Sequence, residues 1–266
     1  MRFLRYPGGK TKLLNFLQNF LPKSNAIDGT YIEPFVGGGS VFLSIRPANA
    51  ILSDLNNELI ELYKGIKNYP HKVWKTFYSF PEGKKAYYKI RDSYYESMPL
   101  YYRAARTLYL NRTCFKGMWR HGHDGNFNVG YGGEERRWVI THENIIELSR
   151  VLSKARLVVS DFEKILNDVR DGDFIFLDPP YKPGQKELTE SHYAYSKFTF
   201  ADQKRLSSKL NEIDCKQNIK WIMTNSAQKE ICALYKGCRI LKIPNGTSGR
   251  IGIYTENLKE VLISNF

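Results

Sequence analysis

The chain has 266 residues, of which 42% are apolar and 14% aromatic, and its 40 Lys and Arg residues outnumber its 27 Asp and Glu residues. This composition excludes a disordered chain, because disordered segments carry too few apolar side chains to form a core. No stretch approaches the roughly 18 apolar residues of a membrane-spanning helix, and no apolar run suits a secretory signal, so we expect a cytoplasmic protein with no membrane partner.

The formal charge of +13 indicates a polyanionic partner. Lys and Arg side chains gain affinity for nucleic acid by displacing the counterions of its phosphate backbone. A basic surface without a specific role is the alternative. The four cysteines contain no C-x-x-C pair and therefore predict neither a disulfide framework nor a structural zinc site.

Short apolar segments recur in both end regions of the chain, with helical patterns between them. Several are apolar at nearly every position, as strands buried on both faces of a parallel sheet tend to be. The predicted strands are 31–35, 51–53, 157–160, 174–177, 221–224, 239–243 and 260–264. Together with helices such as 202–212, they predict an open α/β sheet.

Residues 59–145 differ from both ends of the chain. This segment holds most of the chain's 18 tyrosines, and its periodic parts predict helices. Its later part, 111–133, reads as a glycine-rich loop in which aromatic and basic residues are interleaved. Aromatic rings beside Lys and Arg suit unstacked bases and phosphates, so we interpret 59–145 as an inserted lobe that binds nucleic acid. For 84–109 a tyrosine-rich packing layer is the alternative.

The first predicted strand runs into a glycine-rich turn, E-P-F-V-G-G-G-S at 33–40, and a helix pattern begins at Val41. Glycines at such a turn let a ligand approach the backbone, and the helix N-terminus favours a negatively charged group. The dinucleotide fingerprint requires glycine where Phe42 stands, so NAD is disfavoured. Asp54 ends the next strand, about where an acidic residue binds ribose hydroxyls in nucleoside-binding sheets.

The segment P-G-G-K-T at 7–11 ends like a phosphate-binding P-loop but does not complete that motif. Leu4 stands where the first glycine is required, and no predicted strand precedes the segment. Tyr6 and Lys10 are open to another role, because an aromatic ring suits a nucleoside and an ammonium suits a carboxylate.

The most specific motif is D-P-P-Y at 178–181, directly after the predicted strand 174–177. Two successive prolines stiffen the turn and remove two backbone donors, which leaves carbonyl oxygens and the Asp178 carboxylate as acceptors beside an aromatic ring. The exocyclic amine of a nucleobase offers two N–H donors on a flat ring and matches this arrangement. The alternative is a rigid strand-ending turn with a solvated Asp178.

Two other chemistries are disfavoured. H-G-H-D at 121–124 is too crowded for a metal centre and lacks a second pair of ligands, so we expect no metal. Covalent chemistry at cytosine C5 would need a cysteine nucleophile, normally after a proline, and none of the cysteines follows one.

In the identity and order of these motifs the chain resembles the Dam-type (D12 class) adenine-specific DNA N6-methyltransferases. The resemblance rests on Y-P-G-G-K at 6–10, the turn at 33–40, Asp54, L-Y-L-N-R at 108–112, G-N-F-N-V at 125–129, Asp161 and D-P-P-Y at 178–181. It implies a Rossmann-like S-adenosylmethionine-dependent methyltransferase sheet formed by 1–58 and 146–266. An inserted, mainly helical target-recognition lobe would occupy 59–145.

The resemblance also implies an S-adenosylmethionine site around the glycine-rich turn. Asp54 would bind the ribose hydroxyls, and Asp161, after the third strand, would contact the cofactor's adenine. Tyr6 stands where the family often has Trp, which keeps a stacking surface. The implied cofactor residues are Tyr6, Lys10, Glu33, Phe35, Gly37, Gly39, Ser40, Asp54, Asp161 and Phe162.

For catalysis the resemblance implies that the target adenine is flipped out of the DNA duplex, at a cost of a few kcal/mol. Tyr181 would stack on the flipped base, while the Asp178 carboxylate and the Pro179 carbonyl accept hydrogen bonds from its N6 amine. Pro180 completes the catalytic motif. Alignment of the amine with the methyl group supplies much of the rate, since positioning alone is worth roughly 7–11 kcal/mol.

Five lobe residues fall where the family's hairpin enters DNA: Arg112, Phe115, Lys116, Arg120 and Asn128. By resemblance Phe115 would intercalate beside the flipped base and Arg120 would read a guanine edge. The implied activity is that of a site-specific adenine methyltransferase, EC 2.1.1.72, on a short palindrome such as GATC, although Lys116 stands where Dam itself has an amide residue. We expect no obligate protein partner, and this expectation is compatible with a companion restriction endonuclease. Phosphate contact or packing is the alternative for these residues.

Two other functions stay open on the sequence alone. D-P-P-Y does not choose among exocyclic amines, so cytosine N4 and adenine in RNA are alternative targets. The second alternative function is that of a DNA-binding module that has lost catalysis. It is disfavoured because Asp178, Tyr181, Asp54 and the glycine-rich turn are all present.

Overall fold

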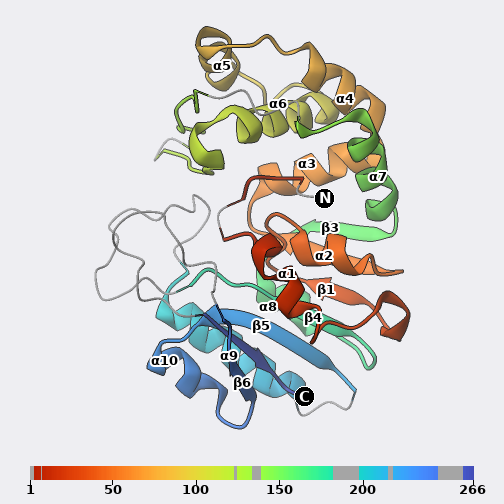
Figure 1. The fold of residues 1–266 in the computed structure, drawn as a ribbon, viewed down its shortest axis with the longest axis vertical. Coiled ribbons are helices and arrows are strands. Elements are labelled where there is room, and N and C mark those ends of the chain that lie inside the picture. Colours follow the sequence, from red (N-terminus) through yellow and green to blue (C-terminus); the bar gives the residue numbers. More distant parts are fainter. Residues whose placement is uncertain are drawn as a thin grey trace.

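The structure is a computed structural model that describes residues 3–6, 8–122, 125–133, 139–181, 198–214, 218–244 and 260–266. Its strands form one seven-stranded sheet in the order β3-β2-β1-β4-β5-β7-β6 (Figure 1). The strands are β1 (Tyr31–Glu33), β2 (Ala50–Asp54), β3 (Ala155–Val159), β4 (Phe174–Leu177), β5 (Lys220–Ser226), β6 (Arg239–Lys242) and β7 (Glu260–Ser264). Each overlaps a predicted strand, which confirms the predicted α/β sheet.

The sheet is parallel from β3 through β5, and β7 runs antiparallel to both β5 and β6. Its strand order reverses between β1 and β4, which pair directly with Tyr31 opposite Phe174. In open α/β sheets ligands bind outside the carboxyl ends of the strands at such a point. The fold therefore makes the edge where Glu33 ends β1 and Asp178 follows β4 the candidate binding site.

Successive side chains of the strands enter two separate apolar cores, because they point to opposite faces of the sheet. Phe174 and Phe176 of β4 belong to one core, and Ile175 and Leu177 belong to the other. Helices α1 (Leu14–Leu17), α2 (Ser40–Ile45) and α3 (Asn57–Asn68) contribute to the first core, and α8 (Phe162–Asn167), α9 (Phe200–Asp214) and α10 (Lys229–Cys232) contribute to the second. Both faces of the sheet are thus covered, as its apolar strands require.

The helices of the predicted lobe lie beyond the β3 edge of the sheet (Figure 1). They are α4 (Pro70–Ser79), α5 (Lys84–Arg91) and α6 (Leu100–Thr113), and α7 (His142–Leu152) leads back to β3. The predicted boundary at 59 falls inside α3, which packs against both α6 and β3. Proline at the first position suits α4, and a capping box between Thr141 and Asn144 begins α7. Every residue of α6 from Ala104 to Thr113 is buried, so this helix forms the centre of the lobe.

The predicted loop at 111–133 begins instead as helix, because α6 continues to Thr113. The polar side chains at its end are satisfied inside the protein, and Thr113 donates to the Tyr109 carbonyl. Beyond α6 the chain turns back as a hairpin, with antiparallel bridges between Cys114 and Tyr131 and between His121 and Phe127. In the part of the chain that the structure describes, no helix is long and apolar enough to cross a membrane.

Candidate active site at the carboxyl edge of the sheet

The glycine-rich turn after β1 depends on glycine at two positions. Gly37 and Gly39 have φ angles of 44° and 63°, a region that side chains disfavour. A Cβ atom on Gly37 would lie 3.0 Å from the Tyr6 ring, and one on Gly39 would lie 3.1 Å from the Tyr63 hydroxyl. Tyr63 also donates a hydrogen bond of 2.8 Å to the Gly37 carbonyl. The turn is therefore closed in by Tyr6 and by Tyr63, a residue that the sequence analysis did not identify.

Asp54 fixes the same turn from the end of β2. Its Oδ2 accepts from the Gly37 backbone N–H at 3.0 Å, and its Oδ1 accepts from the Asn56 backbone N–H at 3.0 Å. Burial raises the pKa of Asp54 to about 6, although the backbone donors oppose the rise. The carboxyl is thus charged at neutral pH and becomes protonated in mildly acidic solution.

Glu33 is a buried acid beneath the turn, with only 2% of its surface exposed. Its Oε2 accepts a hydrogen bond of 2.8 Å from the Tyr31 hydroxyl. Burial raises the pKa of Glu33 to about 8, and the nearby carboxylates of Asp178 and Asp54 add to the rise. At neutral pH this side chain holds a proton, so it lowers the negative charge of the site.

Lys10 and Asp178 form a buried ion pair across the site. Lys10 is 4% exposed, and its Nζ lies 2.8 Å from Asp178 Oδ1, 3.0 Å from the Gly8 carbonyl and 4.8 Å from the centre of the Tyr181 ring. The hydroxyl of Thr224, on β5, donates to the same Asp178 oxygen at 2.8 Å. Among the described residues, Asp178 Oδ2 receives no hydrogen bond. The sequence suggested that the Lys10 ammonium binds a carboxylate of a ligand. In the structure this ammonium pairs with the carboxylate of Asp178.

Protonation of this pair follows from its surroundings. Burial by itself lowers the pKa of Lys10, but Asp178, Tyr181 and Glu260 outweigh burial and raise it above its ordinary value. Burial raises the pKa of Asp178 above its ordinary value, because the Lys10 ammonium and the Thr224 hydroxyl offset the effect of burial only in part. Lys10 therefore remains charged, and it favours the carboxylate form of Asp178.

Aromatic rings gather beside the ends of β1 and β3. Phe35 lies 5.5 Å from Phe162 and 5.7 Å from Phe198, measured between ring centres. Asp161 caps α8, and its Oδ1 accepts from the Glu163 backbone N–H at 3.0 Å. The predicted cofactor residues Phe35, Asp161 and Phe162 thus lie close together on one side of the sheet's carboxyl edge.

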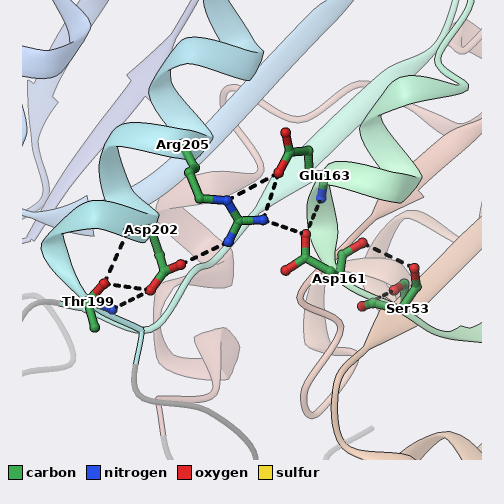
Figure 2. A network of polar contacts seen from close by, with 7 residues as sticks. Ser53, Asp161, Glu163, Thr199, Asp202 and Arg205 are labelled. Atoms are coloured by element: carbon green, nitrogen blue, oxygen red, sulfur yellow. Dashed lines mark hydrogen bonds and ion pairs between the residues drawn. The ribbon is translucent and has the colours of Figure 1, made fainter.

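Arg205 of α9 holds this part of the site together, as Figure 2 shows. Its guanidinium contacts Asp161 Oδ1 at 3.0 Å, Glu163 Oε2 at 2.7 Å and Asp202 Oδ1 at 2.9 Å, and it lies 5.0 Å from the centre of the Phe162 ring. Its partners come from two helices that are distant in sequence. No local motif marks Arg205, so the sequence analysis missed it.

The hairpin places most of its predicted DNA-binding residues at the surface. Phe115 is 46% exposed, and Lys116, at a φ of 52°, has its ammonium 5.2 Å from the centre of the Phe115 ring. Arg120 donates through Nε to Asn128 Oδ1 at 2.8 Å across the hairpin. Arg112 differs, since it is only 4% exposed at the end of α6, and its burial favours the packing alternative.

The amino-terminal segment joins the hairpin to the glycine-rich turn. The Arg5 backbone N–H donates to Asn111 Oδ1 at 3.0 Å, and Asn111 Nδ2 donates to the Arg5 carbonyl at 2.7 Å. The ring of the next residue, Tyr6, lies 5.6 Å from Trp119 of the hairpin.

Pro7 of the predicted Y-P-G-G-K motif lies outside the described residues. Ser40, at the start of α2, makes a hydrogen bond of 3.2 Å with Thr11.

The residues considered for a metal have other partners or fall outside the described part of the chain. His121 pairs through Nε2 with Glu58 Oε2 at 3.0 Å, and Glu58 also accepts from the Tyr95 hydroxyl at 2.8 Å. His123 and Asp124 lie outside the described residues. The expectation that no metal is bound stays a prediction.

The parallel sheet with its antiparallel β7, and the site at its carboxyl edge, define the class of Rossmann-like methyltransferases. Comparison with protein families gives the particular group. The model of the D12 class N6 adenine-specific DNA methyltransferases matches residues 6–247, so the chain belongs to this family.

Several characterised relatives match nearly the full chain. A protein of Lactococcus lactis subsp. cremoris named Type II methyltransferase M1.LlaDCHI is 30% identical over 99% of this chain and 95% of its own length. The Type II methyltransferase M.MjaIII of Methanocaldococcus jannaschii is 32% identical over 99% of this chain and 98% of its own. A DNA adenine methylase of Vibrio cholerae is 27% identical over 98% and 94%, respectively. The predicted family is thereby confirmed.

Proposed function

We propose that the protein transfers the methyl group of S-adenosylmethionine to N6 of an adenine flipped out of duplex DNA, the reaction of EC 2.1.1.72. The observation that carries this proposal is the state of Asp178. Lys10 and Thr224 both bind its Oδ1, while Oδ2 accepts from none of the described residues. Because Lys10 favours the carboxylate form, Asp178 offers an acceptor beside the D-P-P-Y turn, as an exocyclic amine requires.

Asp178, Pro179, Pro180 and Tyr181 would act together on the target base. Tyr181 provides a stacking surface, and the Asp178 carboxylate and Pro179 carbonyl accept from the two N–H groups of the N6 amine. These hydrogen bonds draw the nitrogen lone pair out of conjugation and direct it toward the methyl carbon. The amine then loses a proton, and the Asp178 carboxylate would accept it, because a carboxylate is more basic than the Pro179 carbonyl. Positioning of this kind lowers the barrier without a covalent intermediate.

The described residues fit S-adenosylmethionine in charge and shape. Asp54 and Asp178 lie close enough to Glu33 to raise its pKa, and these two carboxylates suit a cationic sulfonium. Turn positions Gly37 and Gly39 leave no room for a side chain, and the half-buried Phe35, which packs on the buried Phe162, offers apolar surface to an adenine ring. When bound, the cofactor supplies the methyl group. We propose that Asp54 holds its ribose hydroxyls and Asp161 its adenine, with Tyr6, Lys10 and Ser40 beside the turn.

Target recognition is proposed for the lobe at 59–145, with 1–58 and 146–266 as the catalytic part. Phe115 is exposed enough to enter the duplex as a wedge, and Lys116 beside it suits a phosphate. Arg120 uses Nε for Asn128, and among the described residues its two terminal nitrogens make no contact, which leaves them for a guanine edge. We propose a short palindrome such as GATC as the target.

The cellular setting follows from the same proposal. An enzyme that modifies chromosomal DNA acts in the cytoplasm, and we propose that it needs no protein partner for catalysis. Two relatives are named Type II methyltransferases, which supports a restriction-modification setting with a companion endonuclease.

The proposal is tested by following methyl incorporation from labelled S-adenosylmethionine into duplex DNA, single-stranded DNA and RNA of one sequence. We expect incorporation into the duplex, and loss of incorporation in Asp178→Ala with DNA binding largely kept. Wild-type turnover by that variant would contradict the role of Asp178. Preference for RNA would favour the RNA alternative, and cofactor binding without transfer to any substrate would favour a DNA-binding module.

A further inference from the structure

Three polar residues lie at the carboxyl end of β5, directly behind the D-P-P-Y turn. Thr224, Asn225 and Ser226 follow an apolar run and are each 0% exposed. Strands β4 and β5 pair in parallel with Leu177 opposite Met223, so Thr224 comes level with Asp178. Burial of polar side chains is unfavourable unless they find hydrogen-bond partners. The Thr224 hydroxyl bonds to Asp178 of the turn and the Asn225 amide bonds to Gln203, whereas the Ser226 hydroxyl has no partner among the described residues.

Gln203 reaches the same turn from the first half of α9 and is also 0% exposed. Its Nε2 donates to the Pro180 carbonyl at 3.1 Å, and its Oε1 accepts from Asn225 Nδ2 at 3.0 Å. Asn225 Oδ1 in turn accepts from the Ser226 backbone N–H at 2.8 Å. Each amide thus has both ends matched to a partner, and the chain of bonds fixes the Pro180 carbonyl in one orientation.

We propose that Thr224 and Gln203 are positioning residues for methyl transfer, because they select which acceptors of the D-P-P-Y turn face the target amine. Thr224, with Lys10, occupies Asp178 Oδ1, and Gln203 occupies the Pro180 carbonyl. Of the two carboxylate oxygens of Asp178 and the two proline carbonyls, Asp178 Oδ2 and the Pro179 carbonyl remain. This inference rests on the proposed function and adds to it two residues outside the motifs of the turn and the cofactor site.

The physical reason lies in the number of acceptors. Among the acceptors of the turn are four oxygens on Asp178 and the two prolines, namely both carboxylate oxygens of Asp178 and the carbonyls of Pro179 and Pro180, whereas an exocyclic amine has two N–H donors. With all four open, the amine would bind in several orientations, and only those that direct its lone pair at the methyl carbon would react. Because Thr224 and Lys10 occupy Asp178 Oδ1 and Gln203 occupies the Pro180 carbonyl, one pair of these acceptors is left for the amine. Thr224 and Gln203 act through the turn and need touch neither base nor cofactor.

The first test compares Thr224→Val with Thr224→Ser. Valine has nearly the shape of threonine but cannot donate to Asp178 Oδ1, whereas serine keeps the hydroxyl. We expect kcat to fall about tenfold to a hundredfold in Thr224→Val, as for loss of a hydrogen bond to a charged group, while KM for DNA and the cofactor Kd change by less than about twofold. Thr224→Ser should recover most of the rate. Wild-type kcat in Thr224→Val, or an equal loss in both variants, would overturn the role of Thr224.

The second test uses Gln203→Glu, which keeps an acceptor for Asn225 but donates to the Pro180 carbonyl only when its new carboxyl is protonated. Burial raises the pKa of such a carboxyl. The ratio of kcat for the variant to kcat for wild type, at saturating cofactor, should therefore be low at high pH and rise as pH falls. A ratio that does not change with pH would overturn the role of Gln203.

The two levels of the account fail in different ways. Absence of adenine methylation by the wild-type protein would contradict the proposed function itself. Methylation by wild type, with Thr224→Val at the wild-type kcat and a ratio for Gln203→Glu that stays constant with pH, would leave the function intact and overturn the positioning role alone.

Discussion

Glu33 provides a quantitative test of the electrostatics of the site through the substitution Glu33→Gln. The side chain is 2% exposed, and its pKa rises from 4.5 to about 8 in the folded protein. The folded protein therefore holds a proton that the unfolded chain releases between these two pH values. For a group with a raised pKa, the stability contributed is present below the unfolded pKa and is lost as pH rises through the folded pKa.

The size of the effect follows from the same two values. Each pH unit between them removes about 1.4 kcal/mol, so ionisation of Glu33 costs up to about 5 kcal/mol above pH 8. Glutamine stays neutral and can still accept from the Tyr31 hydroxyl. The variant should thus match wild type near pH 5 and exceed its free energy of unfolding by several kcal/mol at pH 8.5.

Urea unfolding of both proteins at five pH values from 5 to 9 measures this difference, because other titrating groups cancel between them. Glu147→Gln, on an exposed carboxylate paired with Arg46, is the control and should leave the pH dependence unchanged. A constant difference between wild type and Glu33→Gln across the range would refute the reasoning.

Three further predictions concern the cofactor and the target. Cofactor affinity, measured by calorimetry, should fall as pH drops below about 6, because Asp54 loses its charge there. The variant Asp54→Asn should bind the cofactor weakly at every pH, and an affinity independent of pH in the wild type would contradict the role of Asp54. Gly39→Ala should destabilise the protein by about 1–2 kcal/mol in urea unfolding, since the left-handed backbone and the contact with the Tyr63 hydroxyl both oppose a side chain; unchanged stability would mean that the turn adapts. Arg120→Ala should relax sequence choice by about 1–3 kcal/mol, seen by sequencing the methylated positions, and an unchanged site preference would refute base reading by Arg120.

The sheet was predictable from sequence because each strand has a local apolar signature. Strand β4, F-I-F-L, is apolar at all four positions and buried at all four, and the turns that follow β1 and β4 carry motifs readable without a fold. The family resemblance supplied the roles of those motifs. The start of the predicted loop at 111–133 was less predictable, because α6 runs on through Asn111, whose side chain binds the Arg5 backbone more than a hundred residues away.

The supporting residues of the site could not be found by reading along the chain. Tyr63, Thr224, Gln203 and Arg205 act on atoms that folding brings to them from distant segments. One local signal existed for Thr224, since three polar residues at the end of a buried apolar strand need partners. For Arg205 the sequence shows only a charged position on an amphipathic helix, and its role follows from the packing of α9 against α8.

The central claim, transfer of a methyl group to adenine N6 in duplex DNA, is tested most directly by identifying the modified base. Purified protein is incubated with S-adenosylmethionine and unmodified genomic DNA, the DNA is digested to nucleosides, and the methylated nucleoside is identified by mass spectrometry, with Asp178→Ala treated in parallel. The account predicts N6-methyladenine confined to one short motif with the wild-type protein, and none with the variant. N4-methylcytosine as the product would contradict it, as would N6-methyladenine formed equally by both proteins.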